Sequence, residues 1–313
     1  MTINTATSIA GIPLSSYVCN ASGPKCTTQT ELMRLGRSTS SAIVMKTCTI
    51  KPREGNPEPR LYRVSGRVLV QSMGLPNLGY EEYIRISKEL KKYKKPIIAS
   101  VAGFSLEEYV TLVSAFQKSD VDLIEVNISC PNISGKTQIS RDFEQVKDHL
   151  QALQNLGPKP IGLKLPQYDV PIHWEKMSEL ILKYGISFIT CINSVGNTLF
   201  INPWTRSAVI KPNKGKGGLS GETIEPIALA NVRAFYELLQ GKVSIFGVGG
   251  VISGISAFKF LLAGADAVQV GTVFELDGVK CFRNIDGDLE KMLKYHGFSS
   301  VAEAKGKLQL LSE

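Results

Sequence analysis

Short apolar runs rich in β-branched residues alternate along this chain with longer stretches whose apolar residues recur at helical spacing. Such runs are expected to be buried strands, and most are separated by enough residues for a crossover helix. The eight expected strands are Tyr17–Ser22, Ala42–Thr47, Pro96–Ala102, Asp122–Asn127, Pro160–Leu165, Ser187–Asn193, Val243–Gly247 and Ala267–Val270. The expected helices are Leu106–Lys118, Phe143–Leu156, Trp174–Tyr184, Pro226–Leu239 and Ile255–Ala263, followed by closing helices between Cys281 and Leu311. Eight βα units predict an α/β fold, a closed (β/α)8 TIM barrel more than an open doubly wound sheet.

The residues at the carboxyl ends of these strands are polar or glycine, although the strands are apolar. Because a TIM barrel gathers the carboxyl ends of its strands around one mouth, we expect these residues to meet there. They are Asn20 to Gly23, Lys46 and Thr47, Ser100, Asn127 to Asn132, Lys164, Asn193 and Ser194, Gly249 and Gly250, and Gly271 and Thr272. The last two pairs follow strands seven and eight, where barrel enzymes commonly bind phosphate through backbone N–H groups. The stretch Gly247 to Gly250 does not read GxGxxG, so a dinucleotide fingerprint is not expected.

The densest candidate chemistry follows the fourth strand, where Asn127 and Asn132 flank Cys130. The two amides can bond donors and acceptors of a small heterocycle, and the thiol can move a proton; a strand-end turn with a structural cysteine is the alternative. A lysine near a barrel axis is costly unless it meets negative charge. Lys164 is therefore expected beside a cofactor that becomes anionic, and Lys46 beside a substrate carboxylate or the cofactor edge, unless both extend outward from the rim. The set suits a flavin mononucleotide (FMN) barrel acting on a planar polar heterocycle, although the residues by themselves do not identify the flavin.

Composition fits one large domain over residues 1–313, with 43% hydrophobic and 20% charged residues. No apolar run reaches the ~20 residues of a membrane span, and the N-terminal residues do not read as a signal peptide. Six scattered cysteines, without a CxxC pair or a histidine at metal-ligand spacing, favour a reducing cytoplasm and no metal site. The net charge of +8 weakly favours anionic small molecules. The basic cluster Lys91–Lys95 is expected to be a solvated helix end and not a nucleic-acid site.

Longer motifs resemble class 1A dihydroorotate dehydrogenase, in the same order, from about Ile12 to Leu311. They are Lys51-Pro-Arg-Glu-Gly-Asn-Pro-Glu-Pro-Arg60, Ser72-Met-Gly-Leu-Pro-Asn77, Asn127-Ile-Ser-Cys-Pro-Asn132, Cys191-Ile-Asn-Ser-Val-Gly-Asn197, Val209-Ile-Lys-Pro212 and Ala228-Leu-Ala-Asn-Val-Arg-Ala-Phe-Tyr236. The resemblance implies a homodimeric FMN barrel that oxidises (S)-dihydroorotate to orotate in pyrimidine synthesis and passes the electrons to fumarate. It also implies that the chain alone couples these steps, without NAD or quinone.

The resemblance assigns roles position by position. It implies that Cys130 is the base, that Lys164 stabilises the reduced flavin, and that residues from Asn132 to Thr137 form an active-site loop acting as a lid. Matches to substrate contacts are Lys46, Gln71, Met73, Gly74, Leu75, Asn127, Asn132, Asn193 and Ser194. Matches to FMN contacts are Ala21, Ser22, Lys46, Thr47, Asn127, Lys164, Ile192, Gly221, Gly249, Gly250, Gly271 and Thr272.

Departures from the family pattern cluster near the expected substrate contacts. Gln71 replaces an asparagine that contacts the substrate, and further differences are Gln167, Thr198, Lys216 and Ser220. One extra methylene moves the amide enough to disturb near-attack geometry. The sequence therefore leaves open a paralogue that oxidises another dihydropyrimidine or cyclic acid. A flavin barrel that reduces uridines in tRNA and a non-catalytic barrel are further alternatives; the first should carry an additional RNA-binding helical region, and intact Cys130 and Lys164 argue against the second.

Overall fold

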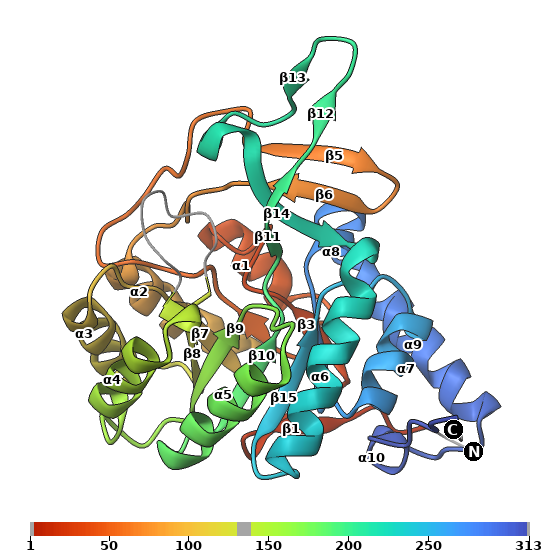
Figure 1. Cartoon of the computed structure of the whole chain (residues 1–313). Coiled ribbons are helices and arrows are strands. Elements are labelled where there is room, and N and C mark those ends of the chain that lie inside the picture. The colour runs from red at the N-terminus through yellow and green to blue at the C-terminus, as the bar shows by residue number, and fades with distance from the viewer. Residues whose placement is uncertain (1–2, 130–138, 312–313) are drawn as a thin grey trace.

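A closed barrel of eight parallel strands forms the centre of the molecule in the computed structural model, which describes residues 3–129 and 139–311. The strand order around the sheet is β3-β16-β15-β10-β9-β8-β7-β4, and each hydrogen-bonded pair is parallel (Figure 1). The strands are β3 (Val18–Asn20), β4 (Ile43–Val44), β7 (Ile97–Val101), β8 (Leu123–Asn127), β9 (Ile161–Leu165), β10 (Phe188–Cys191), β15 (Ser244–Val248) and β16 (Ala267–Val270). Each lies in or within one residue of an expected run, so the predicted TIM barrel is confirmed.

Hydrogen bonds that involve Asn20 and Ser41 close the barrel between β3 and β4, the two strands at the ends of the sheet order. The side chain of Asn20 donates to the Val44 carbonyl at 2.7 Å and accepts from the Val44 N–H at 2.9 Å. The backbone N–H and the hydroxyl of Ser41 both donate to the Val18 carbonyl. An amide carries a donor and an acceptor, so Asn20 completes the seam where the two short strands leave backbone groups to be satisfied.

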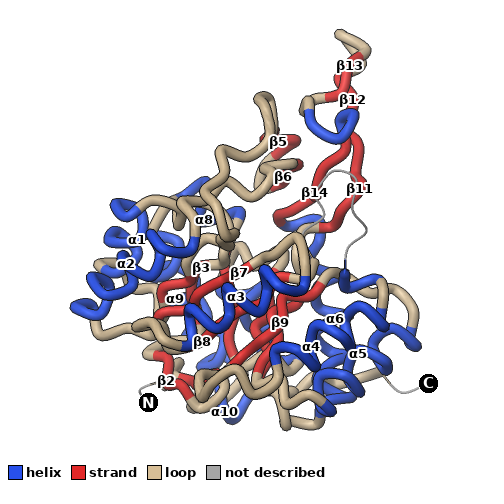
Figure 2. Tube along the Cα trace, turned by 90° about the vertical axis from the view of Figure 1, so that its left-hand side faces the viewer, coloured by secondary structure: helices blue, strands red, loops and turns tan. Residues whose placement is uncertain are grey.

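Helices surround the barrel and bury its outer surface, as the trace in Figure 2 shows. They are α1 (Gln29–Gly36), α2 (Tyr80–Leu90), α3 (Leu106–Gln117), α4 (Phe143–Leu153), α5 (Pro171–Lys183), α6 (Glu225–Leu239), α7 (Gly254–Ala263), α8 (Thr272–Asp277), α9 (Lys280–Tyr295) and α10 (Val301–Ala304). Ser105, Asp142 and Ser253 cap α3, α4 and α7 by accepting from first-turn N–H groups. No helix in this described part of the chain is both long and apolar enough to cross a membrane.

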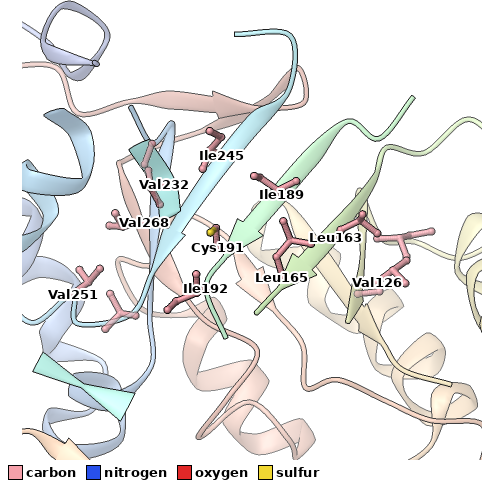
Figure 3. Close-up of a cluster of buried hydrophobic side chains, with 14 of the residues drawn as sticks. Val126, Leu163, Leu165, Ile189, Cys191, Ile192, Val232, Ile245, Val251 and Val268 are labelled. Atoms are coloured by element: carbon pink, nitrogen blue, oxygen red, sulfur yellow. The ribbon is translucent and has the colours of Figure 1, made fainter. Parts of the chain in front are cut away.

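Two apolar regions hold the barrel together. Between the strands and the helices, Leu165, Ile189 and Val268 belong to a continuous buried cluster, part of which Figure 3 shows with Val232 of α6. Inside the barrel, Phe188 and Phe246 fill the end opposite the mouth, where the hairpin of β1 (Thr7–Ile9) and β2 (Ile12–Leu14) packs against them. Functional groups are thereby confined to the other end of the barrel.

A second, antiparallel sheet lies above the mouth and was not expected from the sequence (Figure 1). Its order is β11-β14-β6-β5, formed by β11 (Val195–Leu199), β14 (Lys216–Gly221), β6 (Val68–Gln71) and β5 (Leu61–Ser65). A hairpin of β12 (Ile201–Asn202) and β13 (Ser207–Ala208) projects beyond it. This sheet brings residues of two connections, the one between β4 and α2 and the one between β10 and α6, over the carboxyl ends of the barrel strands.

Candidate active site

One cavity of about 580 Å³ lies between the barrel mouth and the second sheet. Every residue matched to a substrate or FMN contact that falls in the described ranges lines it: Ala21, Ser22, Lys46, Thr47, Gln71, Met73, Gly74, Leu75, Asn127, Lys164, Ile192, Asn193, Ser194, Gly221, Gly249, Gly250, Gly271 and Thr272. Asn20 and Ser100, also expected at the mouth, do not line it. Cys130, Asn132 and the expected lid through Thr137 lie outside the described residues. Positions as far apart in sequence as Ala21 and Thr272 thus meet around one space, as expected if strand ends converge.

Two amides at the mouth are held in fixed orientations. The side-chain oxygen of Asn127, at the end of β8, accepts from the backbone N–H and the hydroxyl of Ser129, both at 3.2 Å. Asn193, just after β10, donates to the hydroxyl of Ser129 at 3.1 Å and accepts from the N–H of Ser194 at 2.8 Å. Since these bonds assign oxygen and nitrogen within each amide, both side chains meet a ligand with a defined donor and acceptor.

Positive charge dominates the cavity wall. The lining cations are Lys25, Lys46, Arg60 and Lys164, whereas the lining carboxylates are Glu31 and Glu275. Lys164 is 4% exposed and forms no ion pair with any residue of the described ranges. Lys46 donates to the Gly23 carbonyl at 2.7 Å. A buried lysine without a protein counter-charge is costly, so an anionic ligand at this wall would offset that cost.

Gln71, at the end of β6, lies in the roof of the cavity. The Gln71 amide nitrogen donates to the Ser194 hydroxyl at 3.2 Å, and its oxygen accepts from the Met73 N–H at 3.1 Å. Opposite them on β14, a side chain at Gly218 would overlap the Ser194 hydroxyl. The Gln71 side chain therefore connects the second sheet to Ser194, which lies shortly after the barrel strand β10.

Two glycines with positive φ angles line the end of the cavity near β15. Gly249 and Gly250 have φ angles of +117° and +84°, and a Cβ on Gly250 would lie 2.5 Å from the Glu225 Cβ. The chain there lies close to the start of α6. Gly271 and Thr272 follow the neighbouring strand β16 and line the same cavity. Backbone N–H groups of such turns can bind an anionic group.

The five described cysteines are free and buried, and none suits a role as base. Burial raises the pKa of Cys48 and Cys191 well above the ordinary value, and for Cys19 burial and the negative charge of Glu125 act together. Burial also raises the pKa of Cys26, although Lys46 opposes it. These thiols are expected to remain protonated and to serve as core residues.

Gln269 lies in the middle of β16 and lines the cavity, but it was not among the residues predicted from the sequence. It is fully buried, and neither its side-chain oxygen nor its nitrogen has a hydrogen-bond partner among the described residues. A buried amide without partners is expensive, so its position at the wall fits a polar ligand or water in the cavity. A glutamine within an otherwise apolar strand was the signal available. Glu125, a fully buried charged residue within the apolar strand β8, was overlooked in the same way.

Comparison with known proteins identifies the family. The family model described as dihydroorotate dehydrogenase matches residues 4–293. The chain is 41% identical to dihydroorotate dehydrogenase (fumarate) of Lachancea kluyveri, covering 93% of this chain and 94% of that protein. It is 38% identical to dihydroorotate dehydrogenase A (fumarate) of Lactococcus lactis subsp. cremoris, over 97% and 99% of the two chains. The crystal structure of a ligand-free dihydroorotate dehydrogenase from Eimeria tenella matches with a TM-score of 0.83 at 19% identity, covering 97% of this chain and 91% of that one, which supports the fold. The chain therefore belongs to the dihydroorotate dehydrogenase family, whose members are flavoenzymes.

Proposed function

We propose that this protein oxidises (S)-dihydroorotate to orotate in pyrimidine synthesis and passes the electrons to fumarate. The observation that carries the proposal is that every described residue matched to a substrate or FMN contact lines one positively charged cavity. The names of the relatives, which specify fumarate, indicate the electron acceptor. Both dihydroorotate and fumarate are anions, and they suit a cavity whose wall carries more lysine and arginine than carboxylate.

The flavin is proposed to be FMN, held as one unit between β15, β16 and the barrel axis. The turns at Gly249 to Gly250 and Gly271 to Thr272 offer one site for a phosphate, as FMN requires, without a Rossmann partner for a dinucleotide. Lys164 supplies a positive charge, and the unpartnered amide of Gln269 supplies a donor and an acceptor to the same cavity. These groups fit a flavin, which supplies the capacity to accept a hydride from the substrate.

The protein groups divide the remaining work. Asn127, Asn193 and Ser194 bind the substrate ring through oriented amides and a hydroxyl, while Lys46 attracts its carboxylate. Cys130, assigned by the family motif, removes the C5 proton as the C6 hydride leaves, so the substrate loses two electrons and two protons in total. Lys164 stabilises the negative charge that reduction brings to the wall of the cavity.

A homodimer in the cytoplasm is the proposed working state. The β12–β13 hairpin exposes large apolar side chains, with Trp204 91% and Ile201 62% exposed, and such a patch is typical of an interaction surface. The free cysteines of the described ranges suit a reducing compartment. Sedimentation equilibrium should show a dimer for the wild type and dissociation for Trp204→Ser; a monomeric wild type would contradict the assignment.

Two experiments test the chemistry. Mass spectrometry of the cofactor released from purified protein should find FMN; FAD, or no flavin after reconstitution, would contradict the cofactor assignment. Cys130→Ala should retain FMN and orotate binding but slow flavin reduction by ~10²–10⁴, typical of losing a general base. Reduction of the Cys130→Ala flavin at the wild-type rate would show that another group is the base.

The Gln71 to Ser194 contact keeps a second candidate open, a paralogue acting on another dihydropyrimidine. Ser194 is a proposed substrate contact, and its hydroxyl already has a protein partner. A substrate screen without oxygen, following loss of the oxidised flavin's absorbance, separates the two. Fast bleaching by another dihydropyrimidine, and none by dihydroorotate, would establish the paralogue.

A further inference from the structure

A chain of hydroxyl groups runs from a carboxylate inside the barrel to the wall of the cavity. The Ser22 hydroxyl lies 2.9 Å from that of Thr47, and Thr47 lies 2.9 Å from Ser100. Ser100 in turn donates to one oxygen of Glu125 at 2.9 Å. Ser22 and Thr47 line the cavity, whereas Ser100 and Glu125 are at most 1% exposed and lie beneath it.

The distances alone leave the direction of two of these bonds open, but Glu125 determines it. A carboxylate only accepts, and the second oxygen of Glu125 already accepts from Thr190 at 2.7 Å. Each hydroxyl has one hydrogen, and Ser100 uses its hydrogen on Glu125. Thr47 must then donate to Ser100, and Ser22 must donate to Thr47. Reversing the Thr47–Ser100 bond would require Ser100 to donate twice, and reversing the Ser22–Thr47 bond would then require Thr47 to donate twice.

Since all hydrogen-bonding positions of Thr47 are used, Ser22 is the one hydroxyl of this series that lines the cavity and still has a lone pair to offer. Thr47 donates to Ser100 and accepts from Ser22 and, at 3.4 Å, from the amide of Asn127, so its hydrogen and both lone pairs are used. Ser22 has spent its hydrogen on Thr47, and among the described residues nothing donates to its oxygen. Its oxygen is therefore available to accept a hydrogen bond from a group in the cavity that Ser22 lines.

We propose that Glu125 is a positioning residue that acts through Ser100 and Thr47 to present Ser22 as a hydrogen-bond acceptor to an N–H or O–H group of the bound flavin. The inference rests on the proposed function, because it takes the flavin as occupant of the cavity. It adds a buried carboxylate to the binding machinery without any contact between that carboxylate and the ligand. A free serine hydroxyl can rotate and either donate or accept. A hydroxyl that is already fixed as an acceptor favours a ligand group that donates, and it loses less conformational entropy when the ligand binds.

A double-mutant cycle on FMN affinity tests the proposal. Apoprotein variants Ser100→Ala, Ser22→Ala and the double variant are titrated with FMN, and the dissociation constant is read from quenching of flavin fluorescence. Ser100→Ala should weaken binding roughly fivefold, the typical worth of one hydrogen bond, although Ser100 does not line the cavity. The double variant should bind no more weakly than Ser22→Ala alone, because Ser100 acts only through Ser22.

Thr190→Val is the matched control, since it removes the other hydrogen bond of the same carboxylate and leaves the chain to Ser22 intact. It should lower the urea midpoint about as much as Ser100→Ala while leaving FMN affinity within about twofold. If Ser100→Ala does not fold, Thr47→Val interrupts the same chain and should weaken FMN binding as much. The proposal would be overturned if Ser100→Ala, or Thr47→Val in its place, left FMN affinity unchanged. It would also be overturned if the losses of FMN affinity in the double-mutant cycle were additive, or if Thr190→Val lost as much FMN affinity as Ser100→Ala. Failure of the wild-type apoprotein to bind FMN would instead overturn the proposed function.

Discussion

Gly221 connects the second sheet to the cavity, and Gly221→Ala should damage both stability and flavin binding. This residue ends β14, pairs with Val68 of β6 and lines the cavity. Its φ of +101° and ψ of −164° lie in a region that essentially only glycine occupies, which costs another residue about 1–3 kcal/mol. An added Cβ would also overlap the carbonyl oxygen of Arg67 and lie 2.9 Å from the carbonyl carbon. Overpacking of this kind typically costs about 1–3 kcal/mol more, so the free energy of unfolding should fall by about 2–6 kcal/mol.

Gly241→Ala is the control for backbone strain without a clash. Gly241 has a φ of +74°, and an added Cβ there would meet nothing within 4 Å. Urea unfolding should therefore show a loss of about 1–2 kcal/mol for Gly241→Ala, with unchanged FMN affinity. Gly221→Ala should lose more stability and bind FMN at least roughly tenfold more weakly, since β14 must move away from β6. Equal stability and equal FMN affinity in the two variants would refute the close approach of β14 to β6.

Three further results are expected. Burial, reinforced by Glu290, raises the pKa of Asp286 from 3.8 to about 6 in the folded state, so its ionisation destabilises the fold above that pH. Asp286→Asn should therefore raise the free energy of unfolding by about 1–2 kcal/mol at pH 7.5, after allowance for partial exposure, and the gain should vanish below about pH 4; a gain independent of pH would contradict this. Lys164→Met should raise the urea midpoint of the apoprotein, by removing a buried charge, yet shift the flavin reduction potential to more negative values; an unchanged potential would place Lys164 away from the flavin. Gln71→Asn should lower the KM for dihydroorotate several-fold, because a shorter amide frees the Ser194 hydroxyl for about one hydrogen bond's worth of binding; a higher KM would show that the substrate needs the Gln71 contact.

The barrel could be predicted from the sequence because its signals are local. Each strand is a largely buried run such as Leu123–Asn127, and in a parallel sheet covered by helices apolar residues predominate in such runs. The convergence of Lys164 with glycines some 85 to 107 residues later follows from the barrel topology, so the cavity wall was predictable in outline.

The second sheet and the hydroxyl chain could not be predicted, because their determinants are not local. β14 has the sequence Lys-Gly-Gly-Leu-Ser-Gly, which has little strand propensity of its own, and it pairs with β6 some 150 residues earlier. Ser100 was expected at a strand end, but its role depends on Glu125 of β8 and on Thr47 from the segment after β4. Glu125 and Gln269 were hidden because an apolar run was treated as uniformly structural.

The central claim is that dihydroorotate delivers electrons to a flavin in this cavity and that fumarate removes them. The most direct test is to add (S)-dihydroorotate to the purified holoenzyme without oxygen, record the visible absorption of the flavin, and then add fumarate. The account predicts bleaching by stoichiometric dihydroorotate with release of orotate, and full return of the oxidised spectrum with fumarate alone. A flavin that stays oxidised with dihydroorotate, or that is reoxidised only with NAD and a second protein, would contradict it.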